Sequence, residues 1–191
     1  MELLSPLAAN QQHCVEQVIG ENNLIYVKEK AGSDVVYIGY NNRDDYYVSI
    51  IRSDDSGRCE TEFQKRIWNC YEERANDACV EGYEFKPMDI QEAELTGNPP
   101  SEIYISFDTL GPGKRINAHH IFYVEEAGGD YEALLHLQLC LGLSSVEIDT
   151  DLQTIVATDD LVCDMFHGRK EHMEYSLLNG EVTVVANWFD E

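Results

Sequence analysis

Short runs of β-branched and aromatic residues recur along this chain, and turn residues separate them. Three such runs lie near the start, at residues 24–29, 35–40 and 46–52. The segments between them, 30–34 and 41–45, are rich in Gly, Asn and Asp and predict turns. Because strands joined by turns this short run in opposite directions, the pattern predicts antiparallel sheets.

The second half of the chain continues this pattern. Strands are predicted at residues 102–108, 118–126, 146–150, 153–157, 175–178 and 181–188. Asn179 and Gly180 stand between the last two runs, and an Asn-Gly pair favours the type I′ turn of a β-hairpin.

Apolar residues at helical spacing predict helices between these strands. Ser5 can cap a helix that starts at Pro6 and ends near Gly20. Four more helices are predicted, over residues 60–79, 88–95, 130–143 and 158–168. Together these elements predict an α+β fold of mainly antiparallel sheets with interspersed helices.

The clearest break in the chain lies at residues 96–101. Pro99 and Pro100 follow Gly97 and Asn98, and two prolines cannot continue a helix or a central strand. We therefore expect an N-terminal α+β subdomain over residues 1–97 and an acidic C-terminal α+β subdomain over residues 101–191, which can also pack as one domain. Both halves show the order strand, strand, helix, which fits either two similar subdomains or a chance recurrence.

The cysteines and the N-terminal residues predict a compartment. The first residues contain neither a positive segment nor an apolar segment of a secretory signal, and no run approaches 18 apolar residues. We therefore expect a cytoplasmic protein of a bacterial host cell with reduced thiols, although six cysteines would also suit three disulfides. The cysteines are Cys14, Cys59, Cys70, Cys79, Cys140 and Cys163.

Motifs of catalysis and metal binding are incomplete. His167 and His172 are five residues apart, whereas zinc proteases place two histidines at i and i+4 on a helix. Cys163 and His167 have that spacing, but no CxxC pair completes a tetrahedral site. Neither GxSxG nor a phosphate-binding loop occurs. We predict no catalytic residue, metal or cofactor; the alternative is a small metal-dependent enzyme that uses Cys163, His167 and His172.

The charge balance excludes some partners and favours others. The chain has 36 acidic and 13 basic residues and a net charge of -23, and its hydrophobic content of 43% is enough for a core. Nucleic acids and anionic membranes repel such a polyanion, so direct binding to either is not expected. The predicted partner is a basic nucleic-acid-binding protein or complex.

The excess of acidic over basic residues is larger in the second half, where no Lys or Arg occurs between Arg115 and Arg169. Glu147, Asp149 and Asp151 alternate, so a strand would place them on one face roughly 6.7 Å apart, about twice the axial rise per phosphate of a DNA strand. Asp160 and Asp164 would stack at i and i+4 on the following predicted helix. The predicted partner-binding residues are Glu125, Glu126, Glu147, Asp149, Asp151, Asp159, Asp160 and Asp164.

Aromatic side chains near these acids are candidates for the desolvated anchors that charge alone does not supply. They are Tyr123, Tyr131, Tyr175, Trp188 and Phe189.

In its acidity, small size, mixed organisation and lack of catalytic motifs, the chain resembles DNA-mimic inhibitors, the anti-restriction and anti-CRISPR proteins of phages and mobile elements. The resemblance implies a non-catalytic inhibitor whose carboxylates occupy the DNA-binding groove of a CRISPR effector or restriction enzyme. Its association would be fast and salt-sensitive. The alternatives are an immunity protein for a basic nuclease toxin, an adaptor, and acidity that serves solubility alone.

Overall fold

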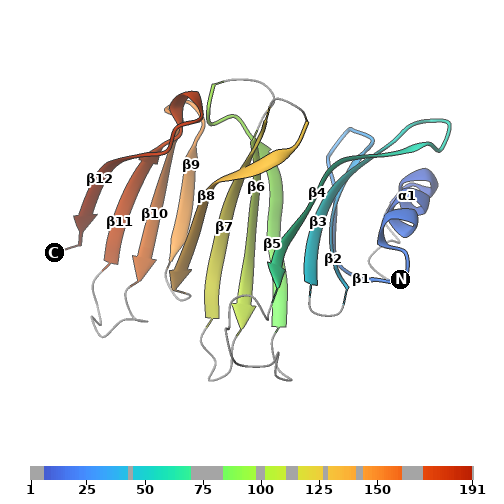
Figure 1. Ribbon diagram of the computed structural model, residues 1–191, viewed down its shortest axis with the longest axis horizontal. Helices are drawn as coiled ribbons and strands as arrows, with labels where there is room; N and C mark the ends of the chain where they lie inside the picture. The colour runs from blue at the N-terminus through green and yellow to red at the C-terminus, as the bar shows by residue number, and fades with distance from the viewer. Residues whose placement is uncertain are drawn as a thin grey trace. The chain divides into compact units, whose positions relative to one another are not determined.

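The computed structural model describes residues 7–42, 45–69, 84–97, 102–110, 116–126, 129–140, 144–160 and 170–190. This part of the chain is mainly β, with three four-stranded antiparallel sheets and one short α-helix (Figure 1). The predicted antiparallel sheets are therefore confirmed, whereas the predicted α+β class with interspersed helices is wrong for the described residues, which are mainly β. The chain divides into two compact units, unit one over residues 1–81 and unit two over residues 82–191.

Unit one contains the α-helix and one sheet. Helix α1 (Ala9–Ile19) is followed by β1 (Asn23–Glu29), β2 (Val35–Asn42), β3 (Asp45–Ser53) and β4 (Cys59–Asn69), which pair in chain order. The first three strands agree with the sequence prediction, and so does the end of the first helix. Its predicted start at Pro6 is wrong, because Leu7 and Ala8 are not helical, and Ser5 lies outside the described residues. Cys14, Val15 and Ile19 of α1 pack in one cluster with Val36, Ile38, Tyr40 and Ile51 of the sheet. No helix in the described part of the chain is long and apolar enough to cross a membrane.

A disulfide joins the helix to the sheet of unit one. Cys14 in α1 bonds to Cys59, the first residue of β4, with the two Cα atoms 5.3 Å apart. The prediction of reduced thiols is therefore wrong for these two residues. Disulfides persist mainly in oxidising compartments, so this bond weighs against the cytoplasmic location, which stays a prediction.

Unit two contains two sheets, each with its strands in chain order. The first sheet consists of β5 (Glu84–Ala93), β6 (Glu102–Leu110), β7 (Ile116–Glu125) and β8 (Tyr131–Cys140). The second consists of β9 (Ser145–Asp149), β10 (Thr154–Asp160), β11 (Lys170–Ser176) and β12 (Thr183–Phe189). Five of the strands predicted in this half coincide with β6, β7, β9, β10 and β12 to within a few residues, whereas the one predicted over residues 175–178 shares only its first two residues with β11.

The predicted hairpin around Asn179 and Gly180 is present. β11 and β12 are antiparallel, and a short 3₁₀ turn, η3 (Leu178–Gly180), lies between them. Asn179 has φ 60° and Gly180 has φ 75°, and a type I′ turn requires positive φ at both central positions. The innermost strand pair is Ser176 with Thr183, so the connection is longer than the turn alone.

Three of the predicted helices lie on strands, and the sequence period explains why. Leu135, Leu137 and Leu139 alternate with exposed His136 and Gln138 in β8, so the helix predicted over residues 130–143 is a strand over residues 131–140, and residues 141–143 lie outside the described residues. Residues 88–95 fall largely on β5 and residues 60–69 on β4, while 70–79 lie outside the described residues.

The fourth of these helices, predicted over residues 158–168, is wrong at its start. Thr158, its predicted cap, and the next two residues belong to β10. The remaining residues, from 161 on, lie outside the described part of the chain.

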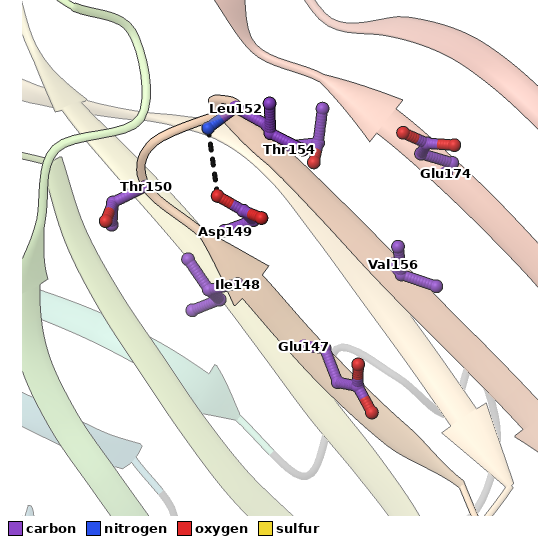
Figure 2. A pocket seen from close by; sticks show the side chains of 8 residues that line it. All are labelled: Glu147, Ile148, Asp149, Thr150, Leu152, Thr154, Val156 and Glu174. Atoms are coloured by element: carbon purple, nitrogen blue, oxygen red, sulfur yellow. Dashed lines mark hydrogen bonds between the residues drawn. The ribbon is translucent and has the colours of Figure 1, made fainter.

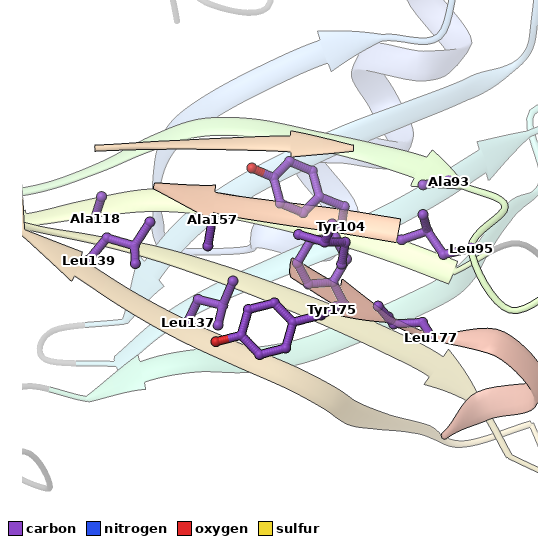
Figure 3. Close-up of a cluster of buried hydrophobic side chains, with 11 residues drawn as sticks. Ala93, Leu95, Tyr104, Ala118, Leu137, Leu139, Ala157, Tyr175 and Leu177 are labelled. Atoms are coloured by element: carbon purple, nitrogen blue, oxygen red, sulfur yellow. The ribbon is translucent and has the colours of Figure 1, made fainter. Parts of the chain in front are cut away.

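One hydrophobic cluster joins the two sheets of unit two (Figure 3). The first sheet contributes Tyr104, Phe122, Leu137 and Leu139 among others, and the second contributes Ile155, Ala157 and Tyr175. Val146, Ile148 and Met173 pack against this cluster from the second sheet. The inner face of the β9–β12 sheet is thus apolar at its centre, where it packs on the first sheet.

Polar contacts hold the ends of the two sheets together. The buried carboxylate of Glu102 accepts the backbone N–H of Leu95 at 2.6 Å and the hydroxyl of Thr96. The carbonyl of Thr96 accepts the N–H of Asn179 at 3.2 Å. The segment after β5 is therefore bonded to both sheets. The predicted subdomain boundary at residues 97–101 falls between β5 and β6, which pair with each other.

Breaking the Cys14–Cys59 bond should lower the unfolding free energy of unit one by about 2–4 kcal/mol, because the unfolded chain has more conformational entropy without this cross-link. The bond closes a sequence separation of 45 residues. The measurement is urea unfolding of the Cys14→Ala/Cys59→Ala variant, followed through amide exchange in β2 and β3. Wild-type protein treated with reductant is the control and should match the variant. Equal stability of oxidised wild type and variant would contradict the expectation.

Candidate functional site

The outer face of the β9–β12 sheet presents carboxylates to solvent. In β9, Glu147 and Asp149 are exposed, whereas Val146 and Ile148, which alternate with them, are half-buried against the core. The two acids therefore share one face of a strand, as their alternation predicts, at a spacing of roughly 6.7 Å.

A third carboxylate, Glu174 of β11, joins this face. Val156 of β10 lies opposite Glu147 on one side and opposite Glu174 on the other, so the two acids flank it. Two strand spacings separate them by about 9.6 Å. Sequence reasoning missed Glu174, although the alternation of His172 and Glu174 with apolar Met173 and Tyr175 indicates it. We call Glu147, Asp149 and Glu174 the acidic face.

A shallow hollow of about 410 Å³ lies on the acidic face (Figure 2). It is lined by Glu147, Ile148, Asp149, Thr150, Leu152, Thr154, Val156 and Glu174. Asp149 accepts the backbone N–H of Leu152 at 2.9 Å, which fixes the turn after β9. The side chain of Leu152 is 69% exposed at the hollow. The site thus combines carboxylates with accessible apolar surface.

Asp151 does not continue the row of acids along β9. The strand ends at Asp149, and Asp151 lies exposed in the turn that follows. The prediction that three acids share one strand face is therefore wrong for Asp151. The Asp149 carboxylate ends the strand by bonding within the turn, as aspartate commonly does.

One of the other predicted acids of this sheet lies on its inner side. Asp159 is half-buried, shares its side of β10 with Ile155 and Ala157, and accepts the hydroxyl of Ser144 at 3.0 Å. Asp160 lies in strand β10, so its predicted helical stacking with Asp164 is wrong. Asp164 itself lies outside the described residues.

Glu125 and Glu126 belong to the other sheet of unit two. Glu125 is the last residue of β7, and the N–H of Glu126 donates to the carbonyl of Asp130 at 2.7 Å in the turn that follows. Tyr123 of β7 pairs with Ile103, the second residue of β6. Glu125, two residues after Tyr123, therefore lies near the start of β6. These two acids therefore lie at the end of the sheet that carries Glu102.

His172 is held on the outer face by three groups. Its Nε2 lies 2.8 Å from Asp190 Oδ1, and its Nδ1 lies 3.0 Å from the hydroxyl of Thr158. Its ring stacks on Trp188 with the centroids 5.1 Å apart. Cys163 and His167, its partners in the metal hypothesis, lie outside the described residues. Within the described ranges, no group of three or more potential ligands is placed to hold a metal ion.

The candidate aromatic anchors divide into two groups. Trp188 is 41% and Phe189 is 50% exposed, so both are available to a partner. Tyr123 and Tyr175 are buried, and the prediction that they are anchors is wrong for both. Tyr131 is half-buried at the start of β8. The exposed aromatics are therefore those of β12.

Two buried histidines of β7 form a further polar cluster of unit two. Burial, followed by the charges of His136 and His120, lowers the pKa of His119 from 6.5 to about 4. Burial also lowers the pKa of His120 to about 4. His119 Nε2 lies 2.9 Å from the hydroxyl of Thr109, and His120 Nδ1 lies 2.7 Å from that of Tyr104. Both rings are neutral at neutral pH and serve as bonded core residues.

The charge of the β9–β12 sheet is one-sided. Across residues 144–160 and 170–190, one lysine, Lys170, accompanies nine acidic residues. Glu147, Asp149 and Glu174 form no ion pair within the described part of the chain, whereas Asp190 pairs with His172.

Comparisons with protein-family models, with curated proteins and with solved structures give no match. The function is therefore inferred from the chemistry of the acidic face.

Acid should destabilise unit two between about pH 6.5 and pH 4 through the two buried histidines. In the unfolded chain they take up protons below pH 6.5, whereas in the folded protein they do so only near pH 4. Their contribution to stability is thus full above pH 6.5 and is lost as the pH falls. The measurement is urea unfolding against pH, read from amide exchange in β7.

The variant His120→Gln keeps an amide for Tyr104 and should show a smaller loss of stability over this pH range than wild type. His13→Gln, at an exposed position of α1, is the matched control and should behave as wild type. An unchanged pH dependence in His120→Gln would contradict the assignment.

Proposed function

We propose that the protein is a non-catalytic inhibitor that binds the basic nucleic-acid-binding surface of a defence complex through its acidic face. The observation that carries the proposal is the placement of Glu147, Asp149 and Glu174 on one solvent-facing surface, with no cation of the described residues paired to them. A surface of such carboxylates attracts Lys and Arg side chains and repels phosphates.

The spacing of the acids supports a partner that normally holds DNA. Glu147 and Asp149 are roughly 6.7 Å apart along β9, and Glu147 and Glu174 are about 9.6 Å apart across the sheet. These separations are comparable to the Debye length of about 8 Å at physiological ionic strength, so the three charges reinforce one another. A groove whose cations are arranged for phosphates meets a similar density of negative charge here.

The apolar lining of the hollow adds short-range contacts to the charge attraction. Val156 lies between Glu147 and Glu174, and Leu152 is exposed beside Asp149. The aliphatic stem of an arginine or lysine can pack on these side chains while its charged end reaches a carboxylate. Such contacts slow dissociation, whereas the long-range field mainly speeds association.

Neutralising the acidic face should strongly weaken capture of the partner. The variant Glu147→Gln/Asp149→Asn/Glu174→Gln loses three charges, but the amide oxygen introduced in place of the Asp149 carboxylate can still accept the N–H of Leu152. The measurement is a pull-down from nuclease-treated bacterial lysate at about 50 mM salt, with elution by duplex DNA and then at about 300 mM salt. Wild type should retain DNA-binding proteins that the duplex displaces, and the variant should retain about tenfold less.

The control variant carries the same charge change in unit one, as Glu16→Gln/Glu21→Gln/Asp55→Asn, at exposed positions. It should retain the same proteins as wild type within about twofold. Equal retention by the acidic-face variant would refute the site. Failure of duplex DNA to displace any retained protein would refute competition with nucleic acid and leave the acidity as a solubility feature.

A further inference from the structure

Strand β12 is a sheet edge without charged side chains. The second sheet of unit two has the order β12-β11-β10-β9, so β12 pairs with β11 alone among the described strands. Its sequence, TVVANWF, contains no charged residue and no proline. Each of the other described edge strands contains at least one charged residue; these strands are β1, β4, β5, β8 and β9. Because edge charges discourage pairing with another chain, β12 lacks the protection of the other edges.

The side chains of β12 leave apolar surface open to solvent. Val184 is 61%, Val185 58%, Trp188 41% and Phe189 50% exposed. Trp188 stacks on His172 of the outer face, whereas Val184 lies opposite Tyr175, a residue of the core cluster. The apolar surface thus extends over both sides of the edge, as is typical of a strand that accepts a neighbour.

Backbone groups of β12 point away from the sheet at known positions. The N–H of Asp190 donates to the carbonyl of Lys170 at 3.1 Å, so these two residues form a hydrogen-bonded pair. Hydrogen-bonded pairs alternate in an antiparallel ladder, which assigns the next ones to Trp188 with His172 and to Ala186 with Glu174. The N–H and C=O groups of Asn187 and Phe189 therefore face outward and can bond to an added strand.

The charges beside β12 select among possible added strands. Glu174 lies opposite Ala186 and Glu171 opposite Phe189, and Asp190 follows the strand directly. A second copy of this chain would bring the same acids against each other on a protein of net charge -23. A basic segment would instead meet opposite charges, which stabilise cross-strand pairs.

We infer that β12 accepts an extended segment of the partner, with alternating basic and apolar residues, as a fifth strand of this sheet. The inference rests on the proposed function and specifies the partner's contact. Basic side chains of the segment lie on the outer face, where the small Ala186 lets them reach Glu174. Its apolar side chains lie on the other face beside Val184 and Phe189.

The test uses a labelled peptide, Lys-Val-Lys-Val-Lys-Val-Lys, and the full protein. Fluorescence anisotropy measures its binding at about 50 mM salt, and amide exchange reports where it lies. Binding should slow exchange of the N–H groups of Asn187 and Phe189. A peptide with Glu in place of Lys should not bind. Absence of binding by the Lys peptide would overturn the inference, while retention of DNA-displaceable proteins would still support the proposed function.

A pair of variants separates backbone pairing from charge attraction. Asn187→Pro removes one outward N–H without removing a bond to β11, and edge strands tolerate such a proline. Asn187→Ala is the matched control, since both variants lose the side-chain bond from Asn187 to Glu171, 3.0 Å long. Asn187→Pro should bind the peptide about three- to tenfold more weakly than Asn187→Ala, the effect of one lost hydrogen bond. Equal affinities would overturn the fifth-strand contact.

A change in the peptide tests the same backbone pairing on the wild-type protein, without the proline variant. N-methylation of alternate residues, in the two possible phases, keeps every charge but blocks one edge of the peptide at a time. One phase should lose binding and the other should retain it. Retention by both phases shows purely electrostatic binding and overturns the inference. Sedimentation of the wild-type protein alone as a dimer that Asn187→Pro disrupts would instead make a second copy the occupant.

Discussion

The hydrophobic cluster between the two sheets of unit two determines which side chains of the second sheet can face solvent. Ile155 and Ala157 of β10 are buried against Leu137 and Leu139 of β8 in this cluster. Because side chains alternate along a strand, burying one set exposes the other, and the exposed set includes Glu147 and the residues in register with it. A slip of one residue would bury carboxylates, at a large desolvation cost.

The two sheets of unit two differ in how much of their surface is free. In β6, every residue from Glu102 to Phe107 is buried, and in β7 the consecutive His119 and His120 are buried as well. A strand buried on both faces has no surface for a partner, and its polar groups must be bonded internally. The second sheet buries one face only. The sheet that carries the acidic face is therefore the one with a face open to a partner, and β12 is an edge of that same sheet.

The sequence predicts the strands bounded by Gly, Asn and Asp turns, since turn chemistry is local. The sequence predicts helices in place of β4 and β8, because residues four apart, such as Phe63 and Ile67, lie on one face of either a helix or a strand. Glu147 and Asp149 were predicted from their alternation within one strand. Glu174 depends on register across β10, and the Cys14–Cys59 bond joins residues 45 apart, so neither follows from local pattern.

The order of strands in a sheet likewise cannot be predicted from local pattern, and the edge position of β12 depends on it. An uncharged apolar edge usually promotes pairing between identical chains. Here Glu171, Glu174 and Asp190 lie next to that edge, and they repel the identical charges of a second copy. The same carboxylates attract a basic segment. The acidic surroundings of β12 therefore discourage self-association and favour a cationic partner through one electrostatic field, which has a short range at physiological ionic strength.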